Sequence, residues 1–233
     1  MNERSIRTAM LLGENATETL AGKHVAVFGI GGVGGFCAEA LARAGVGALT
    51  LVDDDTVSVS NLNRQLVALR STVGMSKTEV MAARIADIDP DCRITVLTKR
   101  YTEETKEEFF SLSFDYIADC IDSVACKTSL IETSIRRDIP IISAMGTGNK
   151  VDPTKFVITD LAKTSGCPLA RVMRRELKQR RILHHTVLYS TEQAIKPLFQ
   201  PEEGKAVPGS VSWVPSCAGL MIAGHIIQKL IEE

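Results

Sequence analysis

A glycine-rich run and the carboxylate that follows it offer the first chemistry in this sequence. An apolar run leads into a helical pattern through four glycines, Gly29, Gly31, Gly32 and Gly34. Small residues at a strand-to-helix turn let backbone amides approach a phosphate at the helix N-terminus. Asp53 closes the next apolar run, nineteen positions beyond Gly34, and suits a carboxylate that accepts ribose hydroxyls. These residues predict an adenine nucleotide or dinucleotide site, and without a G-x-x-x-x-G-K-[ST] motif a P-loop NTPase is excluded.

Charged and polar residues directly after Asp53 favour ATP over NAD. The run contains Asp55, Asn61, Arg64 and Lys77. A diphosphate already bound by helix amides has little need of two further cations, whereas a triphosphate carries extra negative charge that Arg64 and Lys77 would neutralise. Taken alone, such an Arg/Lys pair is also compatible with a solvated loop, so the choice of ATP depends on the other residues.

Two aspartates, Asp119 and Asp122, close the fourth apolar run at the sheet edge where open α/β sheets bind ligands. A carboxylate there can hold Mg²⁺ against the phosphates. Asp119 has the alternative role of capping the turn after the strand. We therefore expect Asp122 to be the metal ligand.

Alternating strand and helix patterns in the first half predict a Rossmann-like, doubly wound α/β fold with a mainly parallel sheet. Strands are expected at 25–28, 49–52, 93–97, 116–121 and 140–143, and helices at about 33–44, 77–88, 103–110 and 127–137. The C-terminal third is expected to extend the sheet with antiparallel strands. Residues 1–233 are interpreted as a single adenylating domain, with nucleotide binding in 1–145 and substrate specificity in 146–233.

The later pattern is looser, with strands expected at 155–159, 186–190 and 210–214, a basic helix at 169–181 and a loop at 196–208. The sequence does not predict the conformation of residues 191–210. The apolar stretch 214–230 is interrupted by Ser216, His225, Gln228 and Lys229. Because a spanning helix needs about 18 uninterrupted apolar residues, we expect a buried C-terminal helix and no membrane partner.

Composition sets the remaining limits. The chain has 233 residues, 45% hydrophobic and 24% charged, with a formal net charge of −1, so nucleic-acid contact would require a local basic patch. The N-terminus lacks a long apolar segment, which predicts a cytoplasmic protein with reduced thiols. None of the six cysteines forms a Cys-x-x-Cys pair, so no zinc is expected; Cys167 and Cys217 are expected to be buried, without a catalytic role.

Five motifs in one order resemble a known family. G-I-G-G-V-G, D-D-D-T-V, N-L-N-R-Q, V-G-M-S-K and D-C-I-D-S-V occur within about residues 7–145, and this set is similar to the adenylating domain of the ubiquitin-activating (ThiF/MoeB/HesA) superfamily. The resemblance implies that Asn61, Arg64 and Lys77 contact the ATP triphosphate. It also implies that Asp53 contacts the ribose and that Asp122 holds Mg²⁺.

The same resemblance implies a homodimer. Arg7, in the run R-T-x-x-L-x-G, matches the arginine that members of this superfamily send into the partner's site. The resemblance thus adds Arg7 to Asp122, Arg64 and Lys77 as catalytic residues.

The second half narrows the resemblance to one branch. Residues 141–150, 160–177 and 208–215 are similar to the tRNA threonylcarbamoyladenosine dehydratases, whereas the thiamine and molybdopterin branches carry zinc-binding cysteine pairs that this chain lacks. The similarity implies tRNA as partner, ATP-dependent adenylation of the threonylcarbamoyl carboxylate, and ring closure with net loss of water. Whether a monovalent cation or a cysteine desulfurase system also binds is left open.

The basic helix is the expected contact for tRNA. Its cations recur at helical spacing on the side opposite Leu169, Val172, Met173 and Leu177: Arg171, Arg174, Arg175, Lys178 and Arg181. Such a helix can pack its apolar side on the sheet and lay its basic side along a phosphate backbone. A solvated basic face is the alternative.

Two rival functions stay open at this stage. The first is an adenylyltransferase that activates the C-terminal glycine of a ubiquitin-like sulfur-carrier protein. The second is a non-catalytic nucleotide-binding dimer or an NAD-dependent dimer.

Overall fold

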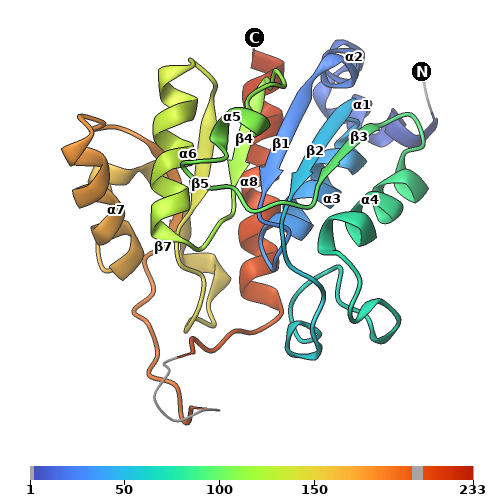
Figure 1. Cartoon of the computed structure of the whole chain (residues 1–233). Coiled ribbons are helices and arrows are strands. Elements are labelled where there is room, and N and C mark those ends of the chain that lie inside the picture. Colours follow the sequence, from blue (N-terminus) through green and yellow to red (C-terminus); the bar gives the residue numbers. More distant parts are fainter. Residues whose placement is uncertain (1–2, 201–206, 233) are drawn as a thin grey trace.

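One seven-stranded sheet organises the protein (Figure 1). The computed structural model describes residues 3–200 and 207–232. Across the sheet the strands are β3 (Arg93–Leu97), β2 (Ala48–Val52), β1 (His24–Phe28), β4 (Tyr116–Asp119), β5 (Ile141–Ala144), β7 (Thr186–Ser190) and β6 (Phe156–Asp160). Neighbouring strands are parallel except β6, which runs antiparallel to β7 at the sheet edge. The predicted doubly wound sheet with an antiparallel C-terminal extension is confirmed.

The two faces of the sheet bury different cores. In β1, Val25 and Val27 belong to one apolar cluster, and Ala26 and Phe28 belong to the other, because successive strand residues point to opposite faces. The first cluster includes side chains of α2 (Glu14–Gly22), α3 (Gly34–Ala44), α4 (Lys77–Ile88) and α8 (Trp213–Glu232). The second includes side chains of α5 (Lys106–Phe109), α6 (Val124–Arg136) and α7 (Pro168–Gln179).

Short helical pieces complete the chain. The helix α1 (Ile6–Leu12) precedes α2. Within the described residues, 3-10 turns lie before α1 and in the later connections: η1 (Glu3–Ser5), η2 (Val59–Asn61), η3 (Arg70–Thr72), η4 (Pro153–Lys155) and η5 (Leu161–Lys163). The sequence did not predict α1 or α2.

The long helix α8 is the expected buried C-terminal helix. By length and composition alone it would suffice to cross a membrane. In the fold it crosses α3, and Ile222, Ala223 and Ile226 lie fully buried in the core. At Gly219 the two helices approach so closely that a Cβ would lie 2.2 Å from the carbonyl oxygen of Val33.

The strand expected at 210–214 is wrong. Residues 207–212 form neither helix nor strand, and α8 already begins at Trp213. Pro215 is tolerated there because the first turn of a helix needs no backbone N–H from it. Part of the loop expected at 196–208, residues 201–206, lies outside the described residues.

Candidate active site

The predicted nucleotide residues meet where the connections leave the sheet in opposite directions. β1 and β4 are neighbours, with Phe28 paired to Asp119. β1 connects to β2 on one side and β4 connects to β5 on the other, which creates the crevice where such sheets bind ligands. A cavity of about 780 Å³ lies there, lined by nine predicted residues: Gly29, Gly31, Gly32, Asp53, Asp55, Asn61, Arg64, Lys77 and Asp122.

Gly34 has a packing role and does not line this cavity. A Cβ on Gly34 would lie 1.7 Å from the carbonyl oxygen of Gly29, so α3 can start this close to β1 only with glycine. Gly29 has a φ of +89°, and a Cβ there would lie 2.8 Å from the carbonyl oxygen of Cys120. Both glycines therefore let the turn between β1 and α3 fold tightly against the end of β4.

Asp53 fixes the glycine turn through its carboxylate. The backbone N–H of Ile30 donates to its Oδ2 at 2.6 Å, and the N–H of Asp55 donates to its Oδ1 at 2.9 Å. Burial raises the pKa of Asp53, although Lys77 and the two backbone donors lower it. Because each carboxylate oxygen has two acceptor sites, Asp53 retains capacity to accept ribose hydroxyls.

Lys77 begins α4 and points its ammonium group toward the end of β2. Its Nζ lies 2.6 Å from Oδ2 of Asp55 and 3.9 Å from Oδ1 of Asp53. The side-chain carboxylates of Asp53, Asp54 and Asp55 lie within 4.8 Å of one another, and Lys77 offsets part of their charge. The predicted cation thus lies at the cavity wall, paired with the carboxylate of Asp55.

Arg64 is positioned by the loop that carries it. Its Nη1 donates to the carbonyl oxygen of Ser60 and to Oδ1 of Asn63, each at 2.8 Å. Asn61 is buried, and its Oδ1 accepts the N–H of Ser58 at 3.1 Å, which closes the turn η2. Asn61 therefore shapes the loop, and both Asn61 and Arg64 line the cavity.

The two candidate metal ligands have opposite environments. Asp119 is fully buried, and its Oδ2 lies 2.8 Å from Nζ of the fully buried Lys127 and accepts the hydroxyl of Ser143 at 2.6 Å. Asp122 is exposed, lines the cavity, and makes no hydrogen bond or ion pair within the described chain. A hard cation takes carboxylate oxygens that are available, which Asp122 offers and Asp119 does not.

The buried polar chain extends from Asp119 to His185. Because the Ser143 hydroxyl donates to Asp119, its oxygen accepts the Nε2–H of His185 at 2.7 Å. Burial lowers the pKa of His185 to about 3, and nearby Lys127 acts in the same direction. This imidazole is therefore a neutral structural donor.

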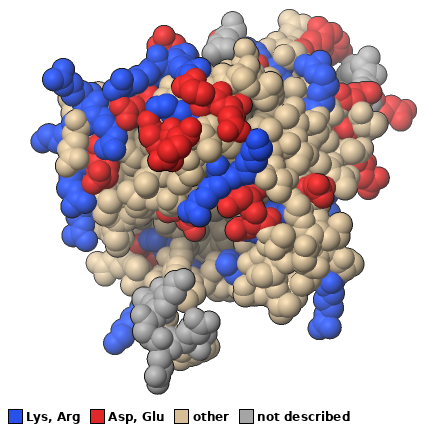
Figure 2. Space-filling view, in the orientation of Figure 1, with Lys and Arg blue, Asp and Glu red and all other residues tan. Residues whose placement is uncertain are grey.

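The basic helix α7 packs as expected, with Met173 and Leu177 buried. Figure 2 shows Lys and Arg side chains gathered along the edge of the molecule where Figure 1 places α7. Of the five predicted contacts, Arg171, Lys178 and Arg181 are exposed and make no ion pair with the residues that the structure describes.

The other two cations of this set contact the protein. Arg174 is half-buried and donates from Nη1 to the carbonyl oxygen of Thr164 at 2.9 Å. Arg175 pairs with Glu176 at 3.1 Å on the surface. Arg174 therefore has a structural task that the spacing did not indicate.

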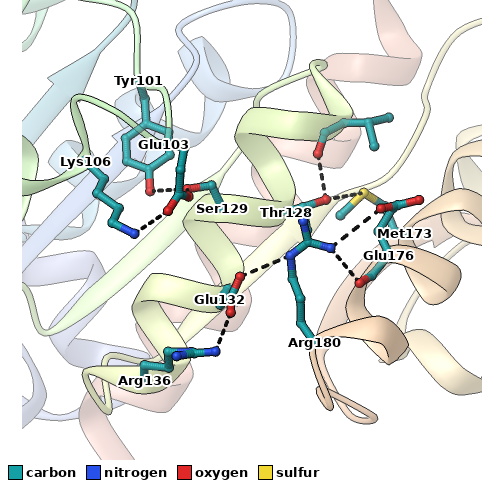
Figure 3. A network of polar contacts seen from close by, with 11 residues as sticks. Tyr101, Glu103, Lys106, Thr128, Ser129, Glu132, Arg136, Met173, Glu176 and Arg180 are labelled. Atoms are coloured by element: carbon teal, nitrogen blue, oxygen red, sulfur yellow. Dashed lines mark hydrogen bonds and ion pairs between the residues drawn. The ribbon is translucent and has the colours of Figure 1, made fainter.

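A polar network joins α6 to α7 (Figure 3). Arg180 lies between the two helices, with its Nε 3.1 Å from Glu132 and its Nη1 3.6 Å from the carboxylate of Glu176. Arg136 pairs with the same Glu132 at 2.6 Å, and Thr128 donates to the sulfur of Met173 at 3.8 Å. The contacts of Arg180 and Thr128 thus join α6 to α7.

Sequence reasoning missed several residues that line the cavity. They come from the ends of β3 and β5 and from the segment before α8: Lys99, Arg100, Tyr101, Thr147, Gly148, Pro208, Gly209 and Ser210. The rule that ligands bind at the carboxyl ends of parallel strands could have identified the first five.

Arg7 lies apart from this cavity. It is exposed on α1 and is not among the residues that line the cavity of its own chain. Exposed apolar side chains share this helix, with Met10 at 79% and Leu11 at 88% exposure.

The fold and the cavity define a doubly wound α/β nucleotide-binding protein with a glycine turn, two cations and an available carboxylate at the switch of strand order. The ThiF family profile matches residues 3–233, and the chain belongs to the ThiF family.

Named relatives match nearly the whole chain. The tRNA threonylcarbamoyladenosine dehydratase of Bacillus subtilis (strain 168) is 44% identical over 97% of this chain and 94% of the relative. The crystal structure of the E. coli tRNA N6-threonylcarbamoyladenosine dehydratase in complex with AMP matches 99% of this chain and 94% of that chain, at 40% identity and a TM-score of 0.91. Its complex with ATP matches to the same extent at 39% identity.

Proposed function

We propose that this protein is an ATP-dependent enzyme that adenylates the threonylcarbamoyl carboxylate of tRNA threonylcarbamoyladenosine and lets the modified nucleoside cyclise. The observation that carries this proposal is the nearly full-length match to a dehydratase whose crystal structure holds ATP. The cavity supports it, because Lys77 and Arg64 supply positive charge beside a glycine turn.

The reaction has two balanced steps. A carboxylate oxygen attacks the α-phosphorus of ATP, an O–P bond forms, and pyrophosphate leaves. A nucleophile of the same nucleoside then attacks the activated carbonyl carbon and loses its proton, and AMP leaves with the former carboxylate oxygen. The nucleoside has lost one water, and no enzyme thioester is needed because the attacking group is already tethered.

The residues of the cavity have distinct tasks in this proposal. Lys77 and Arg64 stabilise negative charge that moves onto pyrophosphate, and the glycine-turn amides orient the phosphates. Asp53 accepts the ribose hydroxyls. Asp122 would hold Mg²⁺, whose chemistry when bound is to neutralise the phosphate oxygens. Its available carboxylate fits such an ion.

Arg7 would act on the site of a second copy. Its place on the exposed, apolar surface of α1, outside its own cavity, supports a homodimer in which each chain sends Arg7 to its partner. Burial of side chains such as Met10 and Leu11 would favour association, since a dimer removes their apolar area from water.

The tRNA would lie along α7. Arg171, Lys178 and Arg181 are the cations on this helix and its C-terminal turn that are exposed without an ion pair in the described chain, and they suit phosphate contacts. Arg174 and Arg175 would contribute less, since each already contacts the protein.

Mass analysis of tRNA nucleosides tests the proposal. Purified tRNA that carries threonylcarbamoyladenosine is incubated with the enzyme and Mg-ATP and then digested to nucleosides. The expected result is a nucleoside lighter by one water, with AMP and pyrophosphate in equal amounts. A control without ATP should leave the nucleoside unchanged.

Two outcomes would contradict the proposal in different ways. Pyrophosphate exchange stimulated by a sulfur-carrier protein, and not by this tRNA, would indicate an adenylyltransferase. Thermal stabilisation by NAD, with no response to Mg-ATP, would indicate an NAD-dependent or non-catalytic dimer; at a hundredfold excess over Kd a ligand adds about 2.7 kcal/mol, which is readily measured.

A further inference from the structure

The segment 208–210 forms part of the cavity wall although it lies far from the nucleotide motifs in the sequence. Pro208, Gly209 and Ser210 all line the cavity. They belong to neither a helix nor a strand, so no sheet or helix hydrogen bonds fix their position. Two asparagine side chains hold this segment instead.

Asn149 holds one side of the segment through two hydrogen bonds. Its backbone N–H donates to the carbonyl oxygen of Gly209 at 2.7 Å, and its Oδ1 accepts the N–H of Gly209 at 2.7 Å. The backbone carbonyl of Asn149 also accepts the N–H of Ile195 at 2.8 Å. Asn149 has a φ of +60°, a conformation that asparagine tolerates better than most residues.

Asn63 holds the other side, from the loop that carries Arg64. Its Nδ2 donates to the carbonyl oxygen of Ser210 at 3.0 Å, and its Oδ1 accepts Nη1 of Arg64 at 2.8 Å. The two partners fix which end of the amide is the donor. The segment 208–210 therefore links the connection after β5 to a loop that carries a predicted ATP contact.

Close packing reinforces the side held by Asn149. A Cβ on Gly148 would lie 2.8 Å from Cβ of Pro208, so these two segments of the chain are in contact. Val151, two residues after Asn149, also contacts α8: its carbonyl oxygen accepts the indole N–H of Trp213 at 2.7 Å. Residues 148–151, which follow β5, therefore contact both the segment 208–210 and the start of α8.

We propose that Asn149 and Asn63 are positioning residues. They set the wall 208–210 against the tRNA substrate, in the part of the cavity that ATP does not occupy. The predicted triphosphate contacts come from the glycine turn and from the loops after β2. The wall carries no charge, and because Asn149 and Asn63 already bind the N–H and carbonyl of Gly209 and the carbonyl of Ser210, its main polar group for a substrate is the Ser210 hydroxyl. Such a group suits an uncharged polar portion of the substrate, such as its hydroxyl or carbamoyl group. This inference rests on the proposed function.

Three substitutions test the two asparagines separately, because Asn149 acts through an acceptor and Asn63 through a donor. Asn149→Gly keeps the positive φ and removes only the acceptor for Gly209. Asn149→Asp keeps an acceptor, so it is the matched control. Asn63→Asp keeps the acceptor for Arg64 but loses the donor to Ser210.

The readout is steady-state kinetics with modified tRNA, together with ATP affinity by calorimetry. For Asn149→Gly and Asn63→Asp we expect the KM for modified tRNA to rise about tenfold, the scale of one lost hydrogen bond. The ATP affinity of Asn149→Gly should stay within about twofold of the wild type, and this variant carries the ATP comparison because Asn63→Asp places a new carboxylate beside Arg64. Asn149→Asp should keep the wild-type KM. Equal KM values for all variants, equal loss in Asn149→Asp and Asn149→Gly, or a matching loss of ATP affinity would each overturn the inference.

Hydrogen exchange at the Gly209 amide gives a readout independent of turnover. Protection should fall in Asn149→Gly and persist in Asn149→Asp; unchanged protection in both would overturn the positioning role. If the wild type forms no cyclised nucleoside, the proposed function fails together with the substrate part of this inference. If only the inference fails, wild-type turnover stays intact.

Discussion

Two aspartates three positions apart show how burial decides the task of a residue. Asp119 ends β4 inside the protein, paired with Lys127 and bonded to Ser143. Asp122 lies beyond the strand with its carboxylate in the cavity. The sequence favoured Asp122 as the metal ligand because Asp119 could cap the turn and because the family resemblance implies Asp122; the buried surroundings of Asp119 add a physical reason.

Substitution of these residues should separate activity from stability. Asp122→Asn should lower turnover by about 10²-fold or more, because charge on the leaving group loses its metal, while the unfolding midpoint stays unchanged. Lys127→Met should cost about 3–5 kcal/mol of stability, since it leaves the buried Asp119 carboxylate with the hydroxyl of Ser143 but without a positive charge beside it. Denaturant unfolding and single-turnover assays measure both. Full turnover in Asp122→Asn would remove it from the catalytic residues.

His185 should make the protein lose stability in acid. Burial lowers its pKa in the folded state to about 3, below the ordinary histidine value of 6.5. Above pH 6.5 neither state binds the proton. Between about pH 6.5 and pH 3 only the unfolded state binds a proton at this histidine. The free energy of unfolding therefore falls, through this residue, by up to about 1.4 kcal/mol for each pH unit of acidification.

The control for this pH dependence lies next to His185 in the chain. His185→Gln keeps a donor for Ser143 and should flatten the decline between pH 6.5 and 3. His184→Gln, at a position whose side chain is 83% exposed, should keep most of it. The free energy of unfolding at several pH values checks this, and identical slopes in wild type and His185→Gln would contradict it.

At the scale of elements, the sequence predicted what periodicity and burial control. Strands β1 to β5 read as short apolar runs because parallel strands are covered on both faces. The segment 210–214 was misread because Val211 and Val214 mimic a strand, and proline was not expected inside a helix.

The missing parts of the cavity depend on contacts between distant segments. Tyr101 and Thr147 follow strands that no nucleotide motif marks, so their place in the cavity follows from strand order. Asn149 and Gly209 are 60 positions apart, and only the folded chain brings them together. Local patterns carry no information about such pairs.

The packing of α8 on α3 should control the glycine turn. Gly219→Ala forces a Cβ to within 2.2 Å of the carbonyl oxygen of Val33, which precedes α3 and lines the cavity. We expect a loss of about 1–3 kcal/mol from overpacking and weaker ATP binding. Gly224→Ala, in the same helix with no atom within 4 Å, should instead gain up to about 1 kcal/mol. Equal effects of the two substitutions on thermal unfolding and on ATP affinity would contradict this account.

At the scale of the whole molecule, we propose that the site is complete only in a dimer. Arg7 lies outside the cavity of its own chain, and the other proposed catalytic residues line it. A chain without Arg7 and a chain without Asp122 should therefore rescue each other, because in a mixed dimer one site receives both intact residues.

Mixing Arg7→Ala with Asp122→Ala measures this rescue. Each variant alone should be nearly inactive, and an equal mixture should recover about a quarter of wild-type activity, since half of the dimers are mixed and each has one intact site. The assay is turnover after subunit exchange, with mass photometry to confirm dimers. No recovery in a mixture that contains mixed dimers would place Arg7 outside the catalytic set.

Transfer of AMP to the substrate carboxylate is the central step of the proposed reaction, and an oxygen label tests it directly. Modified tRNA whose threonylcarbamoyl carboxylate carries oxygen-18 is incubated with the enzyme and Mg-ATP. The masses of the nucleotide and phosphate products are then measured by mass spectrometry. We expect one AMP that carries one heavy oxygen for each cyclised nucleoside. Label in inorganic phosphate together with ADP, or AMP without label, would contradict the proposed transfer.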